Sequence, residues 1–217
     1  MKHIAKGLTL AELVIAIAVT SIIALATTGV AVALSSAQAS ADDYGQSVQS
    51  ARIALRNVGR NLKASVLITG SDSRRLVLWT GDTNLNGKIN YDELAVISYD
   101  PNSKQLSLYR IAFPSDWPQW LKNLVNSEFD LSETSNPQVV ESLLQNSWYS
   151  RTTVLATDVS ACSLATSPAA PLTKLATVDL TIGQDKSALT ASCAAKLRAD
   201  YTSHVVQAAG EYYLDTQ

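Results

Sequence analysis

Residues 6–18 read Lys-Gly-Leu-Thr-Leu-Ala-Glu-Leu-Val-Ile-Ala-Ile-Ala, and this stretch decides the fold. It places one carboxylate, Glu12, at the head of an apolar run, since the 22 residues from Leu13 to Leu34 carry no charge. Because a helix rises about 1.5 Å per residue, roughly twenty such residues span the hydrocarbon core of a bilayer. An ionised carboxylate at the edge of that segment is costly, so Glu12 is a candidate functional residue.

The residues on either side of the apolar run indicate how it lies in a membrane. The preceding segment is basic, with Lys2, His3 and Lys6, and Asp42 and Asp43 follow the run. The positive-inside rule places the basic end in the cytoplasm and the body of the protein outside. No second apolar run approaches this length, so we predict a single-span or signal-bearing protein.

The opening stretch resembles the signature of type IV prepilins, in which Gly, a hydrophobic residue, Thr, Leu, any residue and Glu precede a long apolar helix. Gly7, Leu8, Thr9, Leu10 and Glu12 carry the resemblance. It implies that prepilin peptidase cleaves after Gly7, that Leu8 becomes the methylated N-terminus, and that Glu12 helps subunits assemble. The implied partners are other pilin or pseudopilin subunits and an inner-membrane assembly platform, and the implied destination is a pilus or pseudopilus.

Two other interpretations of the N-terminus compete with this one. The first is a secreted calcium-binding interaction domain with a conventional signal peptide, because residues 37–41 read Ala-Gln-Ala-Ser-Ala and resemble a small-residue cleavage site. The apolar run is longer than the 7–15 residues typical of a signal core, and a Glu precedes it. The second is a plain membrane anchor, which has no need of Glu12. The prepilin interpretation accounts both for the length of the apolar run and for the presence of Glu12 before it.

Beyond the span the apolar residues change their spacing. Val48, Ala51, Leu55, Val58 and Leu62 step by three and four, which is one face of a helix. We therefore predict one helix over residues 8–64, with a transmembrane first half (13–34) and an amphipathic second half.

Strand patterns follow that helix. Leu76–Trp79, Leu94–Tyr99 and Leu106–Ile111 are rich in β-forming residues, and residues 101–104 form a turn between the last two. We predict an α+β fold in which residues 1–7 are a leader and the long N-terminal helix packs on an antiparallel β-sheet head domain (65–217). The layout is similar to that of the larger minor pseudopilins, the J-class or W-class subunits.

Residues 82–93 read Asp-Thr-Asn-Leu-Asn-Gly-Lys-Ile-Asn-Tyr-Asp-Glu and fit the spacing of a twelve-residue calcium loop. In that pattern Gly87 permits a sharp turn and Ile89 points inward. The predicted ligands are five side chains and one backbone carbonyl, namely Asp82, Asn84, Asn86, Asn90 and Glu93 with the carbonyl of Lys88. The flanks look like strands, so we predict a structural Ca²⁺ site in a sheet, with a dissociation constant of about 10⁻⁴–10⁻³ M. The competing interpretation is a plain hairpin turn at Asn86-Gly87.

The two cysteines, Cys162 and Cys193, are 31 positions apart. In a domain outside the cytoplasm they can pair, and we predict a disulfide, the alternative being two small core residues. A bridge over that loop is worth roughly 3–4 kcal/mol on the chain-entropy model.

Composition argues against two classes of function. The net charge of −2 gives no basic footprint for nucleic acid, so no direct nucleic-acid binding is predicted. There are two histidines, and no phosphate-binding glycine loop, Cys/His metal cluster or nucleophile elbow appears in the sequence. We therefore predict a structural protein and not an enzyme.

Overall fold

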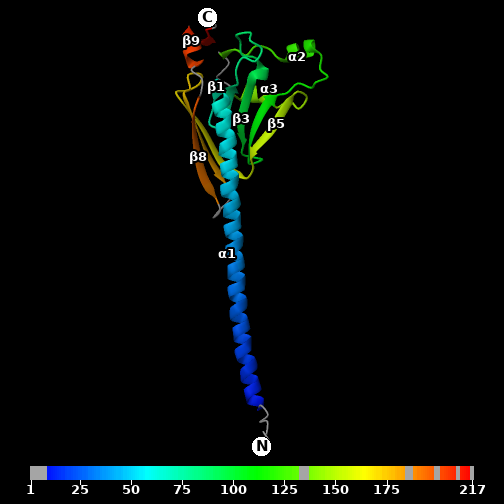
Figure 1. The fold of residues 1–217 in the computed structure, drawn as a ribbon, viewed down its shortest axis with the longest axis vertical. Helices are drawn as coiled ribbons and strands as arrows, with labels where there is room; N and C mark the ends of the chain where they lie inside the picture. Colours follow the sequence, from blue (N-terminus) through cyan, green and yellow to red (C-terminus); the bar gives the residue numbers. More distant parts are fainter. Residues whose placement is uncertain (1–8, 132–136, 184–187, 198–200, 209–210, 216–217) are drawn as a thin grey trace, which may run out of the picture. The chain divides into compact units, whose positions relative to one another are not determined.

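The computed structural model describes residues 9–131, 137–183, 188–197, 201–208 and 211–215. The chain divides into two compact units, Met1–Gly45 and Gln46–Gln217. Helix α1 runs from Leu10 to Ala64 and contributes to both units (Figure 1). The prediction that one helix continues to residue 64 is confirmed.

The first unit is the apolar part of α1. All its described residues are exposed, including Leu13, Leu25 and Leu34. Within the part of the chain that the structure describes, α1 is the one helix long and apolar enough to cross a membrane, by length and composition. An apolar helix at this place fits a membrane-anchored subunit.

Several hydroxyl side chains in this segment donate hydrogen bonds to carbonyl groups of the helix itself. Thr20 Oγ1 donates to the carbonyl of Ala16 at 2.8 Å, and Thr28 Oγ1 donates to that of Ala24 at 2.8 Å. A hydroxyl that is bonded to a carbonyl of the preceding turn needs no hydrogen-bond partner outside the helix. The segment can therefore enter hydrocarbon without leaving these donors unpaired.

The second unit is built from antiparallel strands. The largest sheet has five strands in chain order: β1 (Leu67–Ser71), β2 (Arg75–Trp79), β3 (Leu94–Asp100), β4 (Gln105–Ile111) and β5 (Ser150–Ala156). A three-stranded sheet has β7 between the other two: β6 (Val159–Ser167), β7 (Leu175–Ile182) and β8 (Leu189–Lys196). The remaining elements are short: α2 (Gln119–Val125), α3 (Pro137–Leu144), β9 (Val205–Ala208) and β10 (Glu211–Leu214). The predicted α+β class and the β3–β4 hairpin are confirmed.

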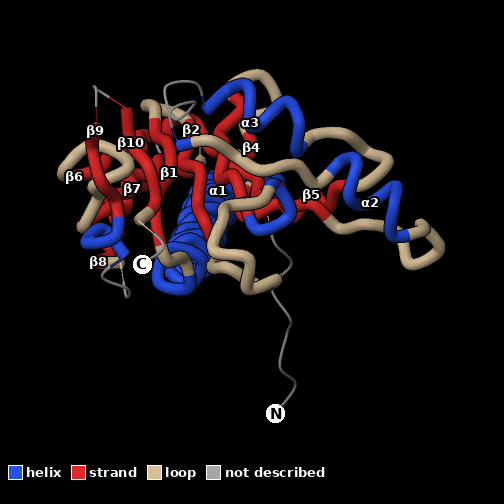
Figure 2. The backbone as a smooth tube through the Cα atoms, turned by 90° about the horizontal axis from the view of Figure 1, so that it is seen from above, coloured by secondary structure: helices blue, strands red, loops and turns tan. Residues whose placement is uncertain are grey.

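Two apolar clusters cover the two faces of the five-stranded sheet. Figure 2 shows α1 and α3 on opposite sides of its strands. On one face Val58 and Leu62 of α1 are fully buried among residues of both large sheets. On the other face Trp79 packs with Phe129 and with Leu144 of α3. Because both faces are covered, β2 and β3 read as nearly continuous apolar runs and do not alternate.

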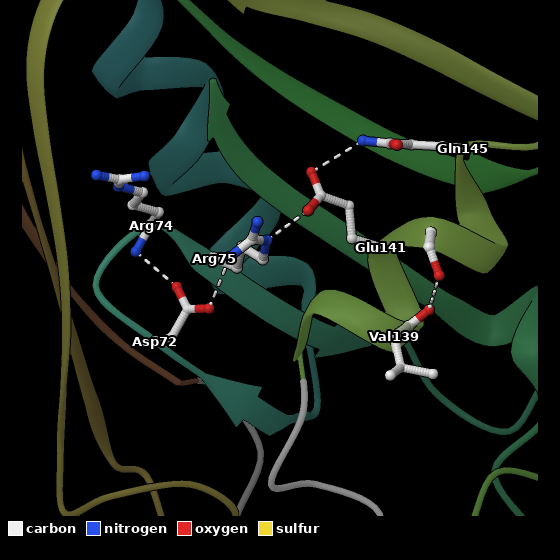
Figure 3. A network of polar contacts seen from close by, with 7 residues as sticks. Asp72, Arg74, Arg75, Val139, Glu141 and Gln145 are labelled. Carbon is white, nitrogen blue, oxygen red and sulfur yellow. Dashed lines mark hydrogen bonds and ion pairs between the residues drawn. The ribbon is translucent and has the colours of Figure 1, made fainter. Parts of the chain in front are cut away.

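A polar network fixes α3 to the sheet (Figure 3). Arg75 on β2 donates from Nε to Glu141 on α3, and from Nη1 to Asp72 Oδ2 at 3.0 Å. Gln145 donates to the second oxygen of Glu141 at 3.0 Å. Glu141 is buried, so its charge requires this guanidinium.

Candidate functional site

The predicted processing residues, Gly7 and Leu8, lie outside the described residues, which begin at Thr9. Glu12 lies in the first turn of α1, where it and Thr9 form a reciprocal cap. Glu12 Oε2 accepts hydrogen bonds from the Thr9 backbone N–H at 2.9 Å and from the Thr9 hydroxyl at 3.0 Å. The Glu12 N–H in turn donates to Thr9 Oγ1 at 3.3 Å. Thr-x-x-Glu is the sequence signal of this capping box; Thr9 was expected only as part of the prepilin signature, and its role as the N-cap was not predicted.

This cap leaves half of the Glu12 carboxylate available. Both hydrogen bonds go to Oε2, so within the described chain Oε1 has no donor. The side chain is also exposed, as are the large apolar residues that follow it, such as Ile15 and Ile22. A carboxylate with one open oxygen therefore stands at the start of a fully exposed apolar helix. That arrangement can accept a cation from another chain.

In the loop 82–93, four predicted ligands come together. The Asp82 carboxylate accepts the N–H groups of Asn86 at 3.1 Å and Gly87 at 2.7 Å. The amides of Asn84 and Asn86 both donate to Asn90 Oδ1, at 3.0 and 2.8 Å. Gly87 has a φ of +73°, so the predicted sharp turn is present.

Two further residues anchor this loop to the head domain. Ile89 is buried against Phe129, as predicted for the inward-facing position. The ammonium of Lys88 pairs with Glu128 at 2.5 Å. The loop is therefore ordered by its own side chains and by its neighbours.

Glu93 has another set of partners. It is buried, and its carboxylate accepts hydrogen bonds from the Trp79 indole at 3.1 Å, the Thr83 N–H at 2.7 Å and the Asn90 N–H at 3.3 Å. It thereby joins the two ends of the loop to strand β2. A cation bound by both oxygens of Glu93 would have to compete with these N–H donors for the carboxylate.

The donor set of the loop fits a hard cation in part. No group of three or more His, Cys, Asp or Glu side chains with metal-binding potential occurs among the described residues. A cation in this loop would therefore depend on the oxygens of Asn84, Asn86 and Asn90, with Asp82 as the charged ligand at the same end. Neutral amide oxygens are ordinary ligands of Ca²⁺.

The predicted disulfide between Cys162 and Cys193 is wrong, because both are free thiols. Cys162 is on β6 and Cys193 is on β8, and β7 lies between these strands. Since neighbouring strands are about 4.8 Å apart, the two residues are separated by roughly 10 Å across the sheet, beyond the reach of a disulfide. Burial, together with the charge of Asp179, raises the pKa of the Cys162 thiol to about 12.

The comparisons with known proteins bear on the N-terminus. Residues 2–28 match the family model of the prokaryotic N-terminal methylation motif. No curated protein and no solved structure matches the chain significantly. The matched segment contains Thr9, Glu12 and the first part of the apolar helix, and proteins with this motif are structural rather than catalytic. The match covers the N-terminal segment alone, and it supports a relation of this chain to the type IV pilins and pseudopilins.

Proposed function

We propose that this chain is a structural subunit of a type IV pilus or a type II secretion pseudopilus, and not an enzyme. Prepilin peptidase cleaves it after Gly7, and the apolar helix then moves from the inner membrane into the core of a filament. Before assembly the head domain lies outside the cytoplasm, and an assembly platform in the inner membrane receives the helix. Its place among the J-class or W-class minor subunits stays a prediction.

The observation that carries this proposal is the carboxylate at the start of the exposed helix, within the methylation motif. A filament core is dry, so the exposed apolar side chains of α1 gain favourable burial there. An ionised carboxylate in that core needs a cation. The N-terminal amine of a neighbouring subunit supplies one, and Oε1 of Glu12 is open to receive it.

Two substitutions separate the charge of Glu12 from its capping role. Glu12→Gln keeps an acceptor for Thr9 and so keeps the capping box, whereas Glu12→Val removes both the acceptor and the charge. We expect both variants to insert into the membrane and both to enter filaments at least tenfold less than wild type. Quantitative immunoblotting of sheared filaments and of membranes measures the two pools. Wild-type incorporation of Glu12→Gln would show that Glu12 only caps the helix.

We also propose that the loop 82–93 holds Ca²⁺ and thereby braces the head domain. The convergence of Asp82, Asn84, Asn86 and Asn90 supports this proposal. With a dissociation constant of about 1 mM, 10 mM Ca²⁺ should stabilise the folded state by about 1.4 kcal/mol. This is a bracing role, and no catalytic step is attached to it.

The calcium proposal is tested by thermal unfolding of the full chain in detergent. Asp82→Asn keeps one of the two acceptor oxygens that receive the N–H groups of Asn86 and Gly87, and it removes the ligand charge, so it should abolish the rise in Tm that Ca²⁺ produces. Asp116→Asn, at an exposed acid outside the loop, should keep that rise. Mg²⁺ at the same ionic strength controls for screening. If 10 mM Ca²⁺ leaves the wild-type Tm unchanged, the loop is a plain turn.

A further inference from the structure

A groove with a volume of about 820 Å³ lies between the second half of α1 and strand β8. Its floor is formed where Gly59 of α1 meets Cys193 of β8, since a Cβ on Gly59 would lie 3.4 Å from the cysteine sulfur. The β8 wall carries only small residues, Ser192, Cys193 and Ala194. The groove is therefore open and shallow, and no large side chain of β8 fills it.

The wall formed by β8 is the edge of a sheet. In the three-stranded sheet β8 pairs with β7 alone, and no other described strand pairs with it (Figure 1). An edge strand presents a row of unpaired N–H and C=O groups, which is a template for a further strand. An extended peptide can use such an edge by adding itself to the sheet.

The opposite wall is strongly basic. Arg56, Arg60 and Lys63 line this wall, and Arg52 lies one helical turn before Arg56. All four are exposed, and together they extend along α1 over roughly 16 Å. None of these four side chains, here called the basic stripe, forms a hydrogen bond or ion pair with another described residue. Arg75 and Lys88, by contrast, both have carboxylate partners.

Like charges three and four residues apart destabilise a helix. No described carboxylate pairs with the basic stripe, so the repulsion among its four positive charges is not offset within the described chain. An anionic partner lying along the stripe would turn the repulsion into attraction. The groove thus offers an extended line of positive charge on one wall and free backbone groups on the other.

We propose that this α1–β8 groove receives an extended, acidic segment of an adjacent filament subunit. The segment adds a strand to the edge of β8 and sets its carboxylates against the basic stripe. A peptide fits better than a nucleic acid, because a phosphate chain cannot satisfy both the N–H and the C=O groups of a strand edge. The inference rests on the proposed function, since it requires subunits assembled side by side.

Two residues of the groove report directly on its occupant. Lys63 has an amine that a carbodiimide joins to a carboxylate in contact with it. Cys193 has a thiol that a maleimide alkylates, and Cys162→Ala leaves it as the only thiol in the chain. Both reactions are run on the full chain in isolated filaments and on the same chain dispersed in detergent.

In filaments we expect Cys193 to be alkylated at least tenfold more slowly than in detergent. Mass spectrometry should find Lys63 joined to an Asp or Glu of an adjacent subunit in filaments only. Arg56→Glu with Arg60→Glu should restore the detergent rate and abolish the cross-link. Arg74→Glu with Lys104→Glu, at exposed cations outside the groove, should change neither result.

If the double reversal on α1 unfolds the head domain, shown by its Tm in detergent, Arg56→Gln with Arg60→Gln replaces it. The outcomes separate this proposal from the proposed function. A chain that enters filaments with Cys193 fully reactive and Lys63 not cross-linked overturns the groove proposal alone. A chain that never enters filaments overturns both. Binding of labelled duplex DNA that is lost in Arg56→Glu with Arg60→Glu would make the groove a nucleic-acid site and also overturn the proposal.

Discussion

The two halves of α1 are one continuous helix with opposite relations to the rest of the chain. Leu25 in the first half is 74% exposed, whereas Leu62 in the second half is 0% exposed and touches two sheets. Apolar surface on this scale is stable only when something covers it. The second half finds its cover within the chain, and the first half must find it in a membrane or in other subunits. The apolar residues of the second half therefore stabilise the fold of the chain itself, whereas those of the first half are available to a membrane or to other subunits.

The strongest way to break this comparison is to remove the same side chain from each half. Leu62→Ala deletes buried methyl groups and leaves a cavity, so it should lower the free energy of unfolding by about 3 kcal/mol. Leu25→Ala should leave that free energy unchanged and instead reduce incorporation into filaments. Chemical unfolding of the full chain in detergent measures the first effect. Equal losses of stability in both variants would contradict the division.

Two neighbouring arginines in the second unit allow the same comparison between a buried and an exposed side chain. Arg75 holds buried Glu141, whereas the neighbouring Arg74 is exposed and its guanidinium is outside this network (Figure 3). Arg75→Ala leaves Glu141 buried without a cation, so it should destabilise the head domain by about 3 kcal/mol. Arg74→Ala should change stability by less than about 0.5 kcal/mol. Thermal unfolding of the two variants decides, and a stable Arg75→Ala would mean that the network is dispensable.

The smallest effect on stability is expected at Asp92, a partly buried carboxylate that lacks some of its hydrogen-bond partners. Burial raises the pKa of Asp92, the charge of Glu93 raises it further, and the contact with Asn126 opposes both. One oxygen of Asp92 is buried without a hydrogen bond. Because the folded state binds this proton more tightly than the unfolded chain, the contribution of Asp92 is favourable at low pH and is lost as pH rises through the raised pKa.

Asp92→Asn should therefore raise the Tm at pH 7 by about 2 °C. The difference from wild type should disappear near pH 3, where the native carboxyl is also neutral. The exposed Asp116→Asn serves as the control, with no change expected at pH 7. A fall in Tm for Asp92→Asn at pH 7 would show that the charge is stabilising.

The elements that could be predicted from sequence are those with strong local signals. Strands β3 and β4 were predicted as Leu94–Tyr99 and Leu106–Ile111, each within one residue of the bounds in the structure, because both are rich in β-forming residues. Strand β8 was missed, since Leu189–Lys196 consists mostly of small residues with little β-propensity. Its position is determined by pairing with β7 and by the close approach of Cys193 to Gly59, which are contacts between distant parts of the chain.

The site residues divide in the same way. The turn at Gly87 and the anchor at Ile89 follow from a local pattern and are present in the structure. The bond between Glu93 and the Trp79 indole depends on how β2 and β3 pair, so the loop sequence alone could not reveal it. The cysteine prediction failed for the same reason, because a separation in sequence does not say which strands are neighbours.

The most direct test of the central claim is the mass of the N-terminal peptide of the mature protein, isolated from cells that contain prepilin peptidase. We expect a chain that begins at Leu8 and carries one additional methyl group on its amine. The same chain from cells without the peptidase should retain residues 1–7. A mature protein that begins after Ala41, or one that keeps Met1 in both strains, would contradict the assignment of α1 as an assembly helix.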